Sequence, residues 1–153
     1  MKRKLLCLLL ILCLCGAVAA LGEDGGKINL RFDGGFALSL PAGWVSYPIE
    51  DGAICYALGD GSGGRYLYIL MQPVDFEDFE AMRAAIDARE GWSKSSPLDL
   101  NGQPFAAFIV PGLNASGCAT LLNGEMLTFL FTPQDDSDYM LTAAEIMASF
   151  RAE

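Results

Sequence analysis

Two Asn-Gly dipeptides, each set between apolar runs, constrain the fold of this 153-residue chain more than any other feature. Asparagine and glycine readily adopt the left-handed backbone conformation that a two-residue hairpin turn requires. Asn101-Gly102 and Asn123-Gly124 therefore predict two hairpins, joined by a turn at Pro111-Gly112. The apolar runs beside these turns are residues 98–100, 105–110, 117–122 and 125–132. They predict an antiparallel meander of four strands.

Four more strands are expected before the meander. Residues 28–32 and 36–40 surround Asp33-Gly34-Gly35, a segment typical of a hairpin turn. Residues 53–58 and 65–71 form the next pair, joined by a glycine-rich loop. The last of these strands is apolar at successive positions, which indicates a central strand covered on both faces.

Two amphipathic helices complete the pattern. Asp75 is a suitable N-cap for a first helix, which is expected to end at Gly91. A second helix is expected over residues 139–150, capped by Asp136 or Asp138. The residues expected on the buried faces are Phe76, Phe79, Met82 and Ile86 in the first helix and Tyr139, Ala143, Ile146, Met147 and Phe150 in the second. This order of elements predicts an α+β fold, an antiparallel sheet flanked by helices.

The N-terminal segment has the pattern of a secretory signal peptide. A basic start and an unbroken apolar run precede Ala17-Val18-Ala19-Ala20, the small residues that a signal peptidase recognises. We therefore expect a secretory signal peptide over residues 1–20, a flexible lead-in over 21–27 and a single domain over 28–153. Such a chain is exported and is either secreted or associated with the cell envelope. An uncleaved membrane anchor and a lipidated cysteine remain alternatives.

The charge balance excludes nucleic-acid binding as the main role. The chain has 10 Lys and Arg against 19 Asp and Glu. Removal of residues 1–20 takes three basic residues and no acid, which leaves 7 basic against 19 acidic residues and a net charge of −12. Such a surface repels phosphates and anionic lipid heads. Contact with a membrane is therefore expected only if the N-terminal segment is retained or lipidated.

The sequence contains no histidine, which removes the base of the usual nucleophilic triads and the commonest metal ligand. Ser62 therefore lacks such a base, and the glycine-rich segment around it is expected to be a loop. Asp135, Asp136 and Asp138 lack the regular oxygen spacing of a calcium loop. We assign no catalytic, cofactor-binding or metal-ligating residue from the sequence.

Cys55 and Cys118 are the two cysteines that remain after removal of residues 1–20. Both lie in apolar runs, and two cysteines of an exported chain can form a disulfide. The alternative is a pair of buried free thiols, which pack as small apolar side chains. The sequence leaves both states open.

Trp44, Tyr47 and Trp92 are candidate contacts for a partner. They lie near the ends of predicted strands and helices, and aromatic side chains often anchor protein interfaces. The alternative role for the same residues is to close the edges of the core.

Residues 36–44, Phe-Ala-Leu-Ser-Leu-Pro-Ala-Gly-Trp, resemble the opening of the PsbP-like family, in which a strand of the form Phe-x-Leu-x-x-Pro-x-Gly-Trp starts the domain. Asn101-Gly102-Gln103-Pro104 and the closing Ile146-Met147-Ala148-Ser149-Phe150 fit the same family. The resemblance covers most of residues 28–151 in the order of elements. It implies a PsbP-like α/β/α sandwich and, because the members are mostly non-enzymatic, a binding or accessory role without catalytic residues.

We therefore expect an exported, non-enzymatic binding or accessory domain without a cofactor, whose partner is an envelope or extracellular protein. One alternative is a small-ligand carrier, which needs a large apolar cavity. The other is a carboxylate- or metal-dependent hydrolase, which needs three or more carboxylates in one pocket with raised pKa values.

Overall fold

A computed structural model of the chain describes residues 19–24 and 26–153. The predicted signal peptide, residues 1–20, lies outside the described residues except for its last two positions. In the part that is described, no helix is long and apolar enough to cross a lipid bilayer.

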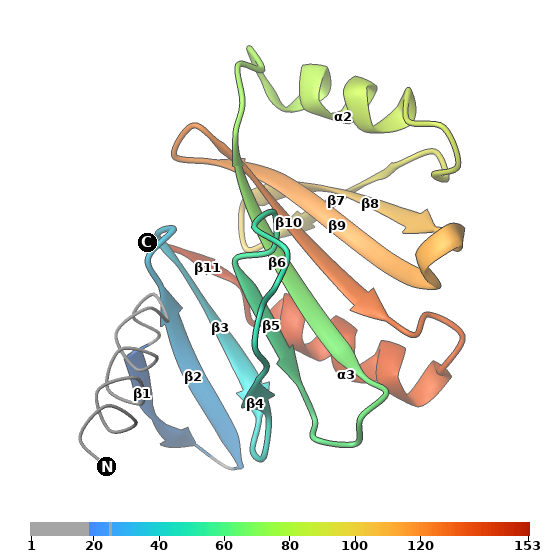
Figure 1. Cartoon of the computed structure of the whole chain (residues 1–153). Helices are drawn as coiled ribbons and strands as arrows, with labels where there is room; N and C mark the ends of the chain where they lie inside the picture. The colour runs from blue at the N-terminus through green and yellow to red at the C-terminus, as the bar shows by residue number, and fades with distance from the viewer. Residues whose placement is uncertain (1–18, 25) are drawn as a thin grey trace, which may run out of the picture.

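A seven-stranded antiparallel sheet forms the centre of the molecule (Figure 1). Its strands are β4 (Val45–Ser46), β5 (Tyr56–Gly59), β6 (Tyr66–Pro73), β7 (Ser96–Leu100), β8 (Gln103–Val110), β9 (Ala115–Leu122) and β10 (Glu125–Thr132). The spatial order is β4-β5-β6-β10-β9-β8-β7. The meander predicted from the two Asn-Gly dipeptides is therefore confirmed. The strand predicted to be central, β6, lies between β5 and β10.

The hairpin turns have the backbone conformation that their residues favour. Asn101 has φ 56° and Gly102 has φ 86°, while Asn123 has φ 53° and Gly124 has φ 83°. Positive φ at both central residues defines the turn type that matches the twist of the flanking strands. The connection between β8 and β9 is a short 3-10 helix, η1 (Pro111–Leu113).

A second, four-stranded sheet packs beside the first. Its strands are β1 (Ala19–Asp24), β2 (Lys27–Phe32), β3 (Phe36–Pro41) and β11 (Arg151–Ala152), in the order β1-β2-β3-β11. Most of the segment expected as a flexible lead-in, residues 21–27, therefore belongs to β1 and the start of β2. Strand β11 follows the last helix directly, and its two residues are too few to show a strand pattern in the sequence.

Two helices of the described residues, α2 (Phe79–Asp87) and α3 (Ser137–Ala148), cover opposite faces of the seven-stranded sheet (Figure 1). Helix α2 begins after Asp78, whose side chain accepts a hydrogen bond from the Ala81 amide at 2.8 Å. The predicted N-cap, Asp75, is therefore wrong by three residues. Helix α3 begins after Asp136, one of the two predicted caps. It ends at Ser149, whose hydroxyl accepts a hydrogen bond from the Ser39 amide at 2.8 Å and so joins α3 to β3.

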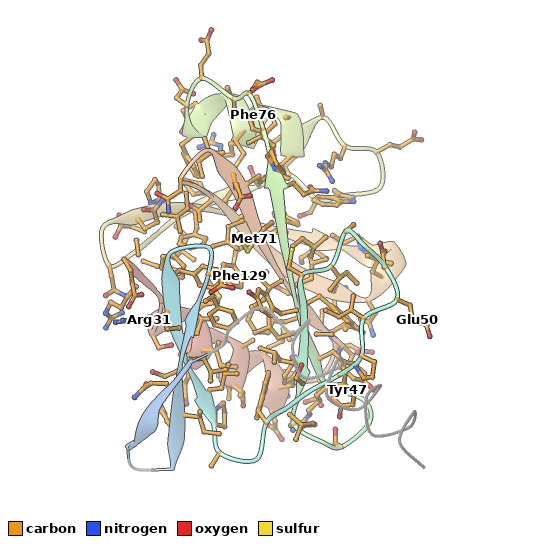
Figure 2. The ribbon with its side chains drawn as sticks, turned by 60° about the vertical axis from the view of Figure 1, so that its left-hand side comes forward. Arg31, Tyr47, Glu50, Met71, Phe76 and Phe129 are labelled. Atoms are coloured by element: carbon orange, nitrogen blue, oxygen red, sulfur yellow. The ribbon has the colours of Figure 1, made fainter. Side chains whose placement is uncertain are left out.

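Two apolar clusters, one on each face of the sheet, form the core. Along β10 the side chains of Leu127, Phe129 and Phe131 belong to the cluster under α3, and those of Met126 and Leu130 to the cluster under α2. Phe129 is fully buried and points into the interior in Figure 2, whereas Phe76 lies near α2. This alternation confirms an α+β fold with the sheet between two helical layers.

Candidate functional site

An open apolar groove lies between α3 and strands β7–β9. Its volume is about 390 Å³. Leu98, Ala107 and Ile109 form its floor together with Cys118, and α3 forms its wall. The side chains that α3 contributes are Met140, Ala143, Ala144 and Met147. The groove is the face of the sheet that α3 leaves uncovered.

The groove exists because α3 covers only part of β8. Phe105, Ala107 and Ile109 share the α3 face of this strand, yet Phe105 is fully buried and Ile109 is 41% exposed. The C-terminal end of α3 lies over the β7–β8 turn, where the Asn101 side-chain amide donates hydrogen bonds to the Ala148 and Phe150 carbonyl oxygens at 3.1 and 2.9 Å. The opposite end of β8 has no such cover in the part of the chain that the structure describes.

The lining of the groove carries no charge. Ser116 and Gln134 supply its polar side chains, and every other described lining residue is apolar or a glycine or cysteine. Leu98 and Ile109, two of its apolar lining residues, are each 41% exposed. Exposed apolar groups that gather around a groove indicate a binding surface more strongly than scattered ones do.

An ion-pair network holds the N-terminal end of α3 against the sheet. The Arg65 guanidinium contacts the Asp136 carboxylate at 2.7 and 2.8 Å and the Asp60 carboxylate at 3.6 Å. Next to it the Tyr139 hydroxyl donates a 2.6 Å hydrogen bond to the Tyr66 carbonyl oxygen. The hydrogen bond from the Tyr139 amide and the contact with Arg65 lower the pKa of Asp136 below its ordinary value. These groups are fully engaged with each other, which favours a structural role.

We predict that Asp136→Asn lowers stability at neutral pH and flattens its decline in acid. A carboxyl group whose pKa is lower in the folded state stabilises the fold above its unfolded pKa of about 4, and this contribution is lost as the pH falls through the folded value. Asparagine keeps the capping side chain and removes only the charge. Urea unfolding between pH 2.5 and 7 measures the effect. The control is Glu50→Gln, at an exposed loop residue that points outward in Figure 2, and an unchanged acid profile in Asp136→Asn would contradict the prediction.

Asp60 and Asp87, like Asp136, have pKa values below the ordinary value of a carboxyl group. Hydrogen bonds from Ser95 lower the pKa of Asp87, and the pKa of Asp60 is also lowered because hydrogen bonds from Ser62 outweigh its partial burial. Among residues 19–24 and 26–153, no group of three or more Cys, Asp or Glu side chains lies close enough to hold a metal ion.

Trp44, Tyr47 and Trp92, the candidate partner contacts, do not share one surface. Trp44 stacks on Tyr139 in the cluster under α3, with ring centroids 6.3 Å apart. Trp92 stacks on Phe108 in the cluster under α2 at 4.7 Å, with the Arg89 guanidinium 4.5 Å from its own ring.

Tyr47 contacts the edge of Tyr66 at 5.2 Å. All three candidate side chains are half-buried, and none lines the groove. The structure places them at the edges of the core.

Cys55 and Cys118 are both free, and their positions keep them apart. Tyr56, the neighbour of Cys55, pairs with Ile69, Ile69 pairs with Phe129, and Phe129 pairs with Cys118. Three strand spacings amount to about 14 Å, whereas a disulfide requires Cα atoms within about 7 Å. Cys55 is exposed and Cys118 is buried, and burial raises the pKa of the Cys118 thiol to about 12. The geometry favours free thiols.

Comparison with solved structures identifies the fold. The solution structure of cyanobacterial PsbP (CyanoP) from Synechocystis sp. PCC 6803 matches 87% of this chain and 99% of its own, with a TM-score of 0.58 and 15% identity. The chain has a PsbP-like fold. A crystal structure from Bacteroides thetaiotaomicron VPI-5482 matches 85% of the chain and 49% of its own, with a TM-score of 0.51 and 14% identity. No family model and no curated protein matches the sequence.

The structure explains the residues of segment 36–44, which resembles the opening of the PsbP-like family. Pro41 ends β3, and Gly43 has φ 88°, a conformation that glycine adopts without strain. This turn carries Trp44 onto the Tyr139 ring of α3. The motif thus closes one edge of the PsbP-like core.

Proposed function

We propose that this PsbP-like chain is an exported, non-enzymatic accessory domain that binds a protein partner through the groove between α3 and β7–β9. The observation that supports binding there is the exposed, uncharged lining, in which Leu98 and Ile109 are each 41% exposed. Export is inferred from the signal-peptide pattern of residues 1–20.

The experiment places a photo-crosslinking amino acid at Ile109 in the full-length gene and irradiates intact cells of the source organism. A matched control places the same group at Ala84, an exposed residue of α2 on the opposite face of the sheet. We expect one dominant adduct from residue 109, which an excess of unlabelled protein suppresses. The same adduct should not form from residue 84. Equal labelling from both positions, or no saturable adduct, would overturn the proposal.

A small-ligand carrier is the second candidate, because about 390 Å³ lies within the range of ligand sites. The groove is open along one side, so a ligand would keep part of its surface in water. A thermal-shift screen with fatty acids and aromatic probes tests this role. A concentration-dependent rise in Tm that Ile109→Asp abolishes would favour the carrier over the protein-binding domain.

A further inference from the structure

The shape of the groove fits a helix. Along its wall the α3 side chains recur at positions 140, 143, 144 and 147, which spans two helical turns. Packed helices lie about 8–10 Å apart and neighbouring strands about 4.8 Å apart. A helix beside α3 would therefore cover about two further strands, the number needed to bury Leu98 on β7 and Ile109 on β8.

The edge of the sheet beside the groove argues against an added strand as the occupant. Strand β7 is the last strand of the sheet, and all but its final residue are exposed. Pro97 has no N–H to offer a partner strand, and Asp99 places a charge on the same edge. Both features weaken pairing with another backbone, so side-chain contact in the groove is the better mode.

The distribution of charge on the chain indicates which residues should flank the apolar face of a bound helix. Every basic residue in 26–153 already makes an internal contact. Lys27, Arg31, Arg65 and Arg83 form ion pairs, Arg89 lies over Trp92, and Lys94 and Arg151 donate to backbone carbonyl oxygens.

Two acidic residues near the groove, by contrast, are not paired with a basic side chain that the structure describes. Asp135 follows the lining residue Gln134 and accepts a 2.8 Å hydrogen bond from the neutral Asn114 side chain, and Asp138 lies in the first turn of α3 near Arg65. Both acids are exposed, and neither forms an ion pair among the described residues. The outward field is therefore negative around an uncharged groove, which favours a partner with basic residues beside an apolar face.

From these observations we infer that the groove binds an amphipathic helix of a partner protein, with apolar residues in the groove and Lys or Arg on its flanks. This inference rests on the proposed function and adds the chemistry of the partner. In the fold, the bound helix would complete the helical layer that α3 begins.

The test uses synthetic helices of about 18 residues, because shorter ones are marginal in water. One peptide has a Leu and Ala face flanked by Lys, a second has the same face flanked by Glu, and a third scrambles the Lys peptide to remove the apolar face. Binding to the protein purified from exporting cells is followed by fluorescence anisotropy at low and high salt. We expect the Lys peptide to bind at least tenfold more tightly than either of the others, with a smaller margin at high salt.

Protein variants then locate the contact. Ile109→Asp places a charge on the floor and Ala144→Lys places a repelling charge on the exposed wall, where lysine suits a helix. Ala84→Asp on α2 is the matched control for added charge. We expect the first two variants to weaken binding of the Lys peptide at least tenfold and the control to leave it unchanged. Circular dichroism verifies that each variant is folded.

Several results would overturn the inference. These are equal affinity for the Lys and Glu peptides, binding of the scrambled peptide as tightly as the helix, and binding that survives both groove variants. A concentration-dependent dimer that Ile109→Asp abolishes would make a second copy of the chain the occupant instead. If crosslinking from residue 109 still captures a partner in cells, the proposed function stands while this inference fails.

Discussion

Replacing Phe129 by alanine is expected to lower the free energy of unfolding by about 3–5 kcal/mol. Phe129 is fully buried at the centre of β10, and its ring meets those of Phe36, Phe105 and Phe150 at centroid distances of 5.7 to 6.2 Å. These rings come from both sheets and from the segment after α3, so the cavity would open where the layers meet.

Urea or guanidinium unfolding measures this loss, and for a chain of this size it corresponds to a fall in Tm of roughly 10–15 °C. The control is Leu141→Ala on the surface of α3, where the side chain is 69% exposed and the change should stay within about 0.5 kcal/mol. A loss below about 1 kcal/mol for Phe129→Ala would show that the rings do not pack as described.

The two thiols are expected to react at very different rates. In the chain without residues 1–20, which keeps only Cys55 and Cys118, a thiol reagent at pH 8 should modify one group quickly and the other only on unfolding. A pKa of about 12 for Cys118 leaves about one thiol in ten thousand as the reactive thiolate, and burial blocks access as well. We expect the labelling rates of the two thiols to differ by at least about a hundredfold, because Cys118 reacts only when the structure around it opens locally.

Mass spectrometry after timed labelling identifies the modified cysteine, and Cys55→Ser removes the fast phase. Labelling in urea should show two reactive thiols with or without a reductant. Two protected thiols that appear only after reduction would establish a disulfide and contradict the strand register that separates them.

The sequence predicts most of the secondary structure because local chemistry decides it. The Asn-Gly turns fix both hairpins, and the buried faces of Tyr139 and Ile146 define α3 from periodicity alone. The sequence places the start of α2 three residues too early because Asp75 and Asp78 are equally good caps in isolation. Only the tertiary packing shows that the helix begins after the second of them.

The groove could not be predicted for a different reason. Ile109 and Phe105 occupy equivalent positions in one alternating strand, and nothing in the pattern distinguishes the buried residue from the exposed one. The difference arises from the path of α3 across the sheet, which depends on contacts between segments far apart in the chain. Trp44, Tyr47 and Trp92 are half-buried and lie outside the groove, and their role as partner contacts stays a prediction, because packing at the edges of the core uses the same residue types as interfaces do.

The position of β6 has a consequence for how the chain acquires its structure. The strands from β7 to β10 pair with their sequence neighbours, so this unit can form by local hairpins. Strand β6 pairs with its sequence neighbour β5 and also with β10, where Tyr66 lies opposite Thr132 and the intervening chain contains α2 and the rest of the meander. Closing so long a loop is slow compared with hairpin formation. The meander should therefore form early in folding. The overall folding rate should then depend on the slower pairing of β6 with β10, which also brings β5 and the ends of α2 and α3 into place.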